Sequence, residues 1–159
     1  MTTLEIEEHI AILIEISSGK DLLIGDINSS DPYVVVSMGK HGIVHKTKYR
    51  KKTLNPEWTP SHNSTYVLST PSYKLIDAGG LTFNVKDYDV ASSDEDLGTI
   101  EVTTEELITE GNAVRVVERD ITPPPEAAGK PAGKLTIRFR KATPEDEASL
   151  AKGEMKRFF

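Results

Sequence analysis

The sequence predicts an all-β protein, an eight-stranded antiparallel β-sandwich with a short helix near its C-terminus. Two observations support this fold class. Short apolar runs rich in β-branched residues recur along the chain, and groups of Gly, Pro, Asn, Asp and Ser separate them. Several runs also alternate apolar and polar residues, which places one face of each strand against a core. The predicted strands are 9–16, 32–38, 44–50, 65–68, 81–86, 98–102, 113–117 and 135–139.

Each strand has its own signal. Residues 9–16 are rich in isoleucine and end before Ser-Ser-Gly, and residues 32–38 contain consecutive valines and end at Gly39. Residues 44–50 alternate apolar or aromatic residues with basic ones. The runs 81–86 and 135–139 alternate strictly, as a strand with one buried face does. The remaining runs are shorter and are bounded by turn residues.

The remaining segments are loops, an extension and a tail. Three prolines at 123–125 and glycines up to 133 predict an irregular loop before the last strand. Thr143, Pro144 and the acids that follow are typical of a helix start, which predicts a helix over about 144–152; a disordered tail is the alternative. We therefore expect an extension at 1–8, one domain at 9–141 and a tail at 142–159.

Composition excludes several classes of function. The 159-residue chain has a formal net charge of −6, which argues against bulk binding to nucleic acid. It has no cysteine, so disulfides, cysteine nucleophiles and thiolate metal sites are excluded, and an intracellular setting is favoured. The acidic N-terminus lacks an apolar signal core, and no apolar run approaches the ~20 residues that a membrane-spanning helix needs. Membrane contact would therefore be peripheral.

Two acidic clusters each follow a predicted strand. The first contains Asp26 and Asp31, and the second contains Asp87, Asp89 and the acids at 94–96. Two carboxylates about 4 Å apart repel by roughly 4 kcal/mol at an effective dielectric near 20. If the fold brings the loops together, the site needs protons or a cation, and oxygen ligands on loops suit calcium. The alternative is that these acids cap turns and hydrate the surface.

Four ordered blocks resemble the C2 domain family, the calcium-dependent phospholipid-binding module of conventional protein kinases C and synaptotagmins. A lone Asp-Pro-Tyr would mean little, but four blocks in order are a specific signal. An extra strand at 135–139 after the usual end resembles the circularly permuted (type II) topology. The blocks are 19–34, 46–58, 81–89 and 94–98.

The resemblance implies a calcium ligand set of five carboxylates: Asp26, Asp31, Asp87, Asp89 and Glu95. Two departures from the family pattern bear on it. Asp26 and Asp31 are five residues apart where six is commoner, and Glu95 stands where the family usually has Asp. Asp94, beside Glu95, is a sixth, less certain ligand. Ile27 and Val90 lie in the two loops and are candidates for contact with the membrane, although a loop apolar residue is as often packed beneath its own turn.

A basic run from Lys40 to Lys52 stands out in this acidic protein. Lys46 and Lys48 are two apart on a predicted strand, so they share a face. The resemblance places them with Tyr33 on a concave surface where some relatives bind phosphoinositide headgroups. The alternative is a solvated strand face. Trp58, the single tryptophan, is expected in the core.

These observations predict a function of calcium-dependent binding to anionic phospholipid membranes, with calcium as the cofactor. Phosphatidylserine is the expected lipid, and the basic strand would add phosphoinositides. We expect a monomer that is cytoplasmic and moves to the membrane as calcium rises. A protein-interaction scaffold, with structural calcium or none, is the alternative. An enzyme is the least supported interpretation, because the sequence offers no general base, nucleophile or substrate cleft.

Overall fold

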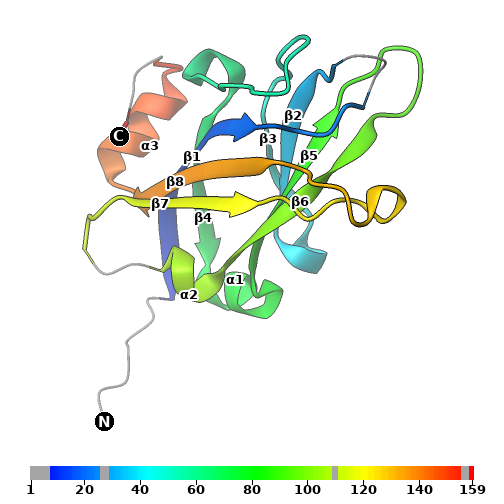
Figure 1. Cartoon of the computed structure of the whole chain (residues 1–159). Coiled ribbons are helices and arrows are strands. Elements are labelled where there is room, and N and C mark those ends of the chain that lie inside the picture. The colour runs from blue at the N-terminus through cyan, green and yellow to red at the C-terminus, as the bar shows by residue number, and fades with distance from the viewer. Residues whose placement is uncertain (1–7, 26–28, 109–110, 155–157) are drawn as a thin grey trace.

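The computed structural model describes residues 8–25, 29–108, 111–154 and 158–159. Within these residues, eight strands form two four-stranded antiparallel sheets that pack face to face (Figure 1). The strands are β1 (His9–Lys20), β2 (Pro32–Ser37), β3 (Ile43–Lys46), β4 (Thr65–Pro71), β5 (Gly80–Asp87), β6 (Glu95–Thr103), β7 (Arg115–Asp120) and β8 (Lys134–Lys141). The order is β4-β1-β8-β7 in the first sheet and β3-β2-β5-β6 in the second. The predicted antiparallel sandwich is confirmed.

The third strand is shorter than predicted. The alternation predicts 44–50, but β3 ends at Lys46. At the next residue, the Thr47 hydroxyl accepts the N–H of Val34 at 2.9 Å, so a side chain replaces a backbone carbonyl beside β2. The backbone N–H of Lys48 then donates to the His62 carbonyl at 2.9 Å. The segment after β3 therefore leaves the sheet and forms the wall of a groove.

The core lies between the two sheets and is built from the inward faces of the strands. Ile14, Phe83 and Phe139 are fully buried. Trp58 is 4% exposed and packs in the same cluster, which confirms its expected place in the core. Burial of each such side chain contributes about 1.5–3 kcal/mol.

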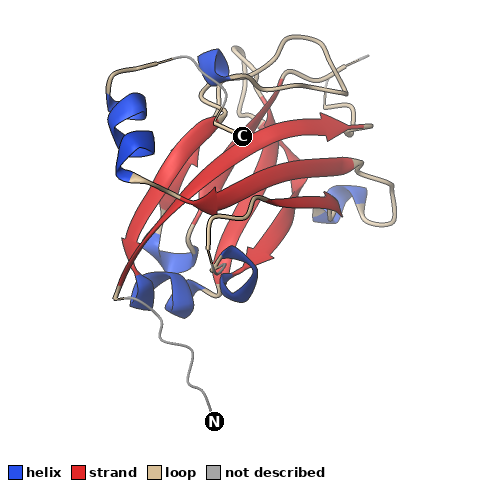
Figure 2. Cartoon of the chain, turned by 90° about the vertical axis from the view of Figure 1, so that its left-hand side faces the viewer, coloured by secondary structure: helices blue, strands red, loops and turns tan. Residues whose placement is uncertain are grey.

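Helical segments lie at the ends and edges of the sheets, and none separates the two sheets in the described part of the chain (Figure 2). We did not predict α1 (Ser72–Ala78) or α2 (Thr104–Leu107), which follow β4 and β6. The predicted C-terminal helix is confirmed as α3 (Pro144–Ala151), and the Thr143 hydroxyl caps it by accepting the N–H of Asp146. The proline-rich loop before β8 contains a 3-10 turn at Pro125–Ala127, where we expected irregular chain throughout.

The first and last strands are antiparallel neighbours. Lys20 at the end of β1 pairs with Lys134 at the start of β8, and Ile12 pairs with Lys141. The permuted arrangement requires this adjacency. The chain therefore enters and leaves the sandwich at one end, while the loop after β1 and the loop before β8 lie at the other (Figure 1).

A buried ion pair fastens α3 to the first sheet. Arg140 on β8 donates to both carboxylate oxygens of Asp146 at 2.7 and 3.0 Å. The Phe159 ring also lies 5.5 Å from the Arg140 guanidinium. The bond from Arg140, opposed by burial, lowers the pKa of Asp146 to about 2. The carboxylate is therefore charged at neutral pH and stabilises the docked helix.

We expect Asp146→Asn to lower the free energy of unfolding at pH 7 by about 2 kcal/mol. Because the folded-state pKa is depressed, this stability is complete above the ordinary carboxyl pKa near 4 and is lost as pH falls towards 2. Urea unfolding of both proteins between pH 7 and pH 2 measures the difference, which should shrink through that window. Glu145→Gln, at an exposed position in the same turn, is the control. A difference that stays constant with pH would contradict the assignment.

Candidate functional site

The fold brings the two acidic loops together at one end of the sandwich. We call residues 21–31 the first acidic loop and residues 87–96 the second. The backbone N–H of Asp31 donates to the Asp87 carboxylate at 2.7 Å, and the N–H of Tyr88 donates to the Asp31 carbonyl at 3.0 Å. Asp87, the last residue of β5, is only 4% exposed. A carboxylate from the second loop is thus buried against the backbone of the first.

Gly25 allows this close approach. A Cβ atom at Gly25 would lie 2.4 Å from Oδ2 and 2.8 Å from Cβ of Asp87, well inside van der Waals contact. The buried Ser30 hydroxyl closes the loop around it by accepting the Gly25 N–H at 2.7 Å and donating to the Leu23 carbonyl at 2.8 Å. Glycine is required here for space, because the Asp87 side chain occupies the place of a side chain at residue 25.

The other acids of the site have local donors. One oxygen of Asp31 accepts the N–H of Lys52 at 2.7 Å. The Asp89 carboxylate accepts the N–H of Ala91 and the Ser92 hydroxyl, both at 2.8 Å. The bond from the Ala91 backbone, followed by that from Ser92, lowers the pKa of Asp89, so this group is charged at neutral pH. Glu95 is exposed at the start of β6.

The donor set suits calcium in its chemistry. Asp31, Asp87, Asp89 and Glu95 offer only carboxylate oxygens, which are the ligands that calcium takes. Within residues 8–25, 29–108, 111–154 and 158–159, no three His, Asp or Glu side chains are grouped so that they could hold a metal ion. The candidate ligand Asp26 and the candidate membrane contact Ile27 lie outside the described residues.

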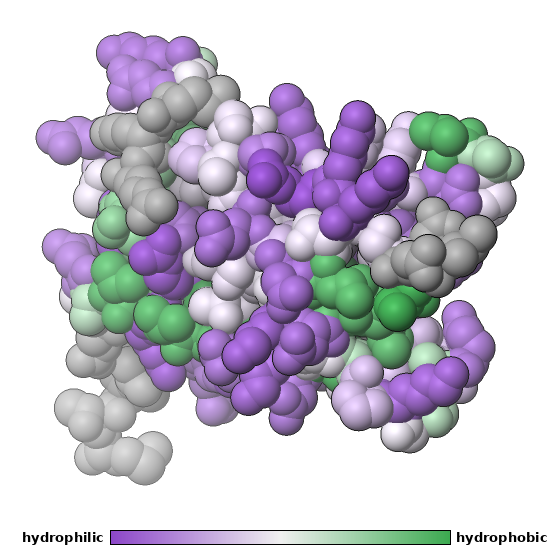
Figure 3. Space-filling model, turned by 45° about the horizontal axis from the view of Figure 1, so that its top comes forward, coloured by the Kyte–Doolittle hydropathy of each residue, from purple (hydrophilic) through white to green (hydrophobic). Residues whose placement is uncertain are grey.

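Apolar side chains project at the same end of the molecule. Val90, in the second acidic loop, is 86% exposed, and Ile24, in the first, is 55% exposed. Figure 3 shows apolar surface at this end, beside hydrophilic surface. Exposed apolar groups at the rim of a charged site are suited to contact with a lipid headgroup layer.

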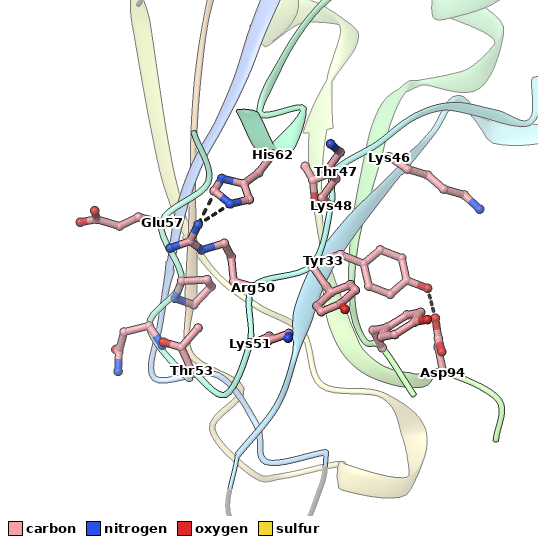
Figure 4. Close-up of a pocket in the computed structure, with 14 residues that line it drawn as sticks. Tyr33, Lys46, Thr47, Lys48, Arg50, Lys51, Thr53, Glu57, His62 and Asp94 are labelled. Atoms are coloured by element: carbon pink, nitrogen blue, oxygen red, sulfur yellow. Dashed lines mark hydrogen bonds between the residues drawn. The ribbon is translucent and has the colours of Figure 1, made fainter. Parts of the chain in front are cut away.

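A basic groove of about 980 Å³ lies beside the acidic loops (Figure 4). It is lined by Tyr33 at the start of β2, by the end of β3 and the segment that follows it, and by Tyr88 and Asp94 of the second acidic loop. Tyr33, Lys46 and Lys48, which we expected on one concave surface, all line it. Arg50 and Lys51, from the predicted basic run 40–52, also line it. We did not expect the remaining lining residues in this groove: Thr47, Tyr49, Thr53, Asn55, Pro56, Glu57, His62, Tyr88 and Asp94.

A hydrogen bond and an aromatic stack, both made by tyrosines, join the groove to the second acidic loop. The Tyr33 hydroxyl donates to the Asp94 carboxylate. Burial, together with this bond to a negative group, raises the pKa of Tyr33, so the hydroxyl keeps its proton. The rings of Tyr49 and Tyr88 stack with centroids 4.3 Å apart and planes 4° from parallel. Tyr88 lies between Asp87 and Asp89, so this stack links the groove wall to the second loop.

Arg50 and His62 contact each other on the side of the groove opposite Tyr33 and Asp94 (Figure 4). Arg50 Nη1 lies 3.2 Å from His62 Nδ1. Burial, and then the positive charges of Arg50 and Lys48, lower the pKa of His62, which keeps the ring neutral and able to accept from Arg50. The four histidines of the chain show no metal-ligand spacing, and no local pattern in the sequence signals that His62 faces Arg50.

The described residues thus combine a two-sheet β-sandwich, two acidic loops at one end and a basic groove beside them. The family model of the C2 domain matches residues 11–118, and the chain belongs to the C2 domain family. This membership supports binding to membrane lipid, or calcium-dependent binding, in general. No helix in the described part of the chain is long and apolar enough to cross a bilayer.

Relatives carry the same module within longer proteins. The chain is 37% identical over 108 residues to the probable ADP-ribosylation factor GTPase-activating protein AGD13 of Arabidopsis thaliana, a match that covers 67% of this chain and 29% of that protein. It is 40% identical over 88 residues to the Arabidopsis thaliana protein C2-DOMAIN ABA-RELATED 4, with 55% and 44% covered. The chain thus spans less than half the length of these curated relatives.

Solved structures agree with the fold. The first C2 domain (domain A) of plant Extended Synaptotagmin 1 matches with a TM-score of 0.65 and 20% identity, over 84% of this chain and 96% of that one. The calcium-bound pair of C2 domains, A and B, of Extended Synaptotagmin 2 matches with a TM-score of 0.61 and 23% identity, over 90% of this chain and 49% of that one. At these identities the likeness shows the shared fold alone.

We expect Gly25→Ala to lower the free energy of unfolding by about 1–3 kcal/mol, because the new methyl group displaces the buried Asp87 side chain. Chemical denaturation without calcium measures this effect. Ser29→Ala, in the same loop, removes an atom and adds none, so it is the control. Equal stability of Gly25→Ala and the wild-type protein would show that the two loops do not pack as described.

Proposed function

We propose that this C2 domain binds anionic phospholipid membranes in response to calcium, through the end of the sandwich that carries both acidic loops. The observation that carries the proposal is the contact between the Asp31 backbone and the Asp87 carboxylate, which places two acidic loops side by side. Exposed apolar side chains and a basic groove flank this pair of loops. In this proposal the binding module is residues 9–141, a non-catalytic monomer that moves from the cytoplasm to the membrane.

Calcium would be held by Asp31, Asp87, Asp89 and Glu95, together with Asp26, and Asp94 is a less certain sixth ligand. When bound, calcium reverses the local negative charge and offers coordination positions to lipid phosphate. Without it, the clustered carboxylates repel an anionic surface. Val90 extends from the second loop, where it can enter the headgroup layer. The change that recruits the domain is therefore one of charge and requires no rearrangement of the sheets.

The basic groove would bind the phosphorylated headgroup of a phosphoinositide. Lys46 and Lys48 are exposed, and both line the groove that Tyr33 also lines (Figure 4). A multiply phosphorylated headgroup offers several negative groups to these side chains at once. A flat layer of phosphatidylserine presents single charges, each worth about 1 kcal/mol per lysine near the surface.

We expect calcium to raise the melting temperature, because it binds the folded state and relieves carboxylate repulsion. The stabilisation is about 2.7 kcal/mol at a hundredfold excess over the dissociation constant. Differential scanning calorimetry in EDTA and in millimolar calcium measures it. Asp87→Asn combined with Asp89→Asn should abolish the shift. A full calcium response in this double variant would mean that other residues bind the ion.

Sedimentation with phosphatidylserine vesicles, in EDTA and in calcium, tests whether membrane binding depends on calcium. We expect the wild-type protein to sediment in calcium and to remain in solution in EDTA, since only the calcium-loaded loops attract an anionic surface. Vesicles of phosphatidylcholine alone are the control. Absence of calcium-dependent sedimentation, with calcium binding intact, would favour the protein-interaction scaffold.

Lys46→Ala combined with Lys48→Ala should weaken binding to vesicles that contain phosphatidylinositol bisphosphate more than binding to phosphatidylserine vesicles. The loss on phosphatidylserine should be about 2 kcal/mol or less, because the charges act there only through screened attraction. Lys130→Ala combined with Lys152→Ala removes the same charge from exposed positions outside the groove. If both double variants lose the same affinity, or if the lysine variant loses the same affinity for both vesicle types, the lysines act only through nonspecific charge attraction.

A further inference from the structure

Two carboxylates line the basic groove, and they differ in where they point. Glu57 is exposed and extends from the far wall, away from the lysines (Figure 4). Asp94 lies on the opposite side, bonded to the Tyr33 hydroxyl. Tyr33 lines the groove together with Lys46 and Lys48, so the Asp94 charge would oppose phosphates that these lysines hold in the groove. A negative group in an anion site opposes binding unless something offsets its charge.

The two oxygens of Asp94 are held by two different parts of the proposed membrane site. One accepts the hydroxyl of Tyr33, on β2 in the groove. The other accepts the backbone N–H of Asp89, in the second acidic loop, at 2.9 Å. The Asp94 carboxylate thus connects the groove to the second acidic loop, and its negative charge contributes to the electrostatic potential of both. The Tyr33 proton is also committed to Asp94, so it is not offered to a phosphate while this bond persists.

We propose that Asp94 couples the two halves of the membrane site: its carboxylate keeps the groove closed to polyphosphorylated headgroups until the charge of the second acidic loop is offset. This inference rests on the proposed function. Asp94 lies next to Glu95 and is tied to Asp89, so a cation held by the loop acids would offset the Asp94 charge as well. The Asp94 charge near Tyr33 would then no longer oppose a phosphorylated headgroup. Headgroup binding in the groove would therefore depend on calcium, although the groove lysines do not bind calcium themselves.

The decisive measurement is made without calcium. In EDTA, Asp94→Asn should bind vesicles containing phosphatidylinositol bisphosphate about tenfold more tightly than the wild-type protein, the size expected from removing one screened like charge near a surface. Asparagine is nearly the same shape: its one side-chain oxygen can accept the Asp89 N–H, and its amide N–H can donate to the Tyr33 oxygen, so the fold and the groove geometry should be kept. Thermal unfolding checks that both proteins are equally folded.

Asp120→Asn is the matched control. It makes the same change of charge at an exposed position on β7, outside the groove. Soluble inositol trisphosphate, titrated by calorimetry in EDTA, separates the headgroup from the membrane surface: Asp94→Asn should tighten its binding too, and Asp120→Asn should not. The ratio of bisphosphate-vesicle affinity in calcium to that in EDTA should also fall in Asp94→Asn, because the calcium-free state is already open.

Three results would overturn the coupling role: no gain in EDTA, an equal gain in Asp120→Asn, or an unchanged ratio of affinities. Failure of this inference is distinguishable from failure of the proposed function. If loss of Lys46 and Lys48 leaves bisphosphate binding unchanged, the groove is not the headgroup site. If the lysine variant loses binding but Asp94→Asn behaves as the wild-type protein, only the coupling is wrong.

Discussion

The pairing of β2 with β5 holds the acidic loops and the basic groove in one frame. In this ladder Pro32 lies opposite Asp87, and Tyr33 lies opposite Lys86. Residues next to each other on a strand face opposite sides of the sheet, so Val34 enters the core while Tyr33 faces the groove. A register shift of one residue would exchange these faces. Val34 and Val36, the two β2 valines in the core cluster, therefore fix the register, and the register places Tyr33 beside Asp94 and Asp31 beside Asp87.

Local patterns in the sequence were enough to predict the strands and the last helix, and they were insufficient wherever distant residues decide the structure. The signals of α3, a threonine cap followed by proline and acids, are contiguous. The end of β3 depends on the Thr47 hydroxyl reaching Val34, which residues 44–50 alone do not reveal. For α2 a signal was present, since Thr103 and Glu106 form a capping box. For α1 there is no side-chain cap, and the helix is held by burial of Leu75.

The candidate site likewise contains features that local sequence patterns predict and features that depend on distant residues. Alternation within the predicted strand 44–50 led us to expect Lys46 and Lys48 on one surface; both line the groove, although β3 ends at Lys46 and Lys48 lies beyond the strand. The contacts that give the groove its character join separate segments: Tyr49 stacks on Tyr88, and Arg50 meets His62. Such pairs carry no periodic signal, because their spacing along the chain is set by the loops between strands. The sequence could therefore indicate which residue types gather, but not which of them touch.

The antiparallel pairing of β1 with β8 has a practical consequence for handling the protein. Both ends of the sandwich, at His9 and Lys141, emerge at the end remote from the acidic loops. A fluorophore, an affinity tag or a neighbouring module joined there would lie at the end of the domain opposite the acidic loops. Immobilisation next to His9 would thus present the loops and the groove outward to vesicles in solution, whereas the chain after Lys141 folds back through α3 onto β8. If the acidic loops contact lipid as proposed, a second module on a tether could lie on the side of the domain away from the membrane.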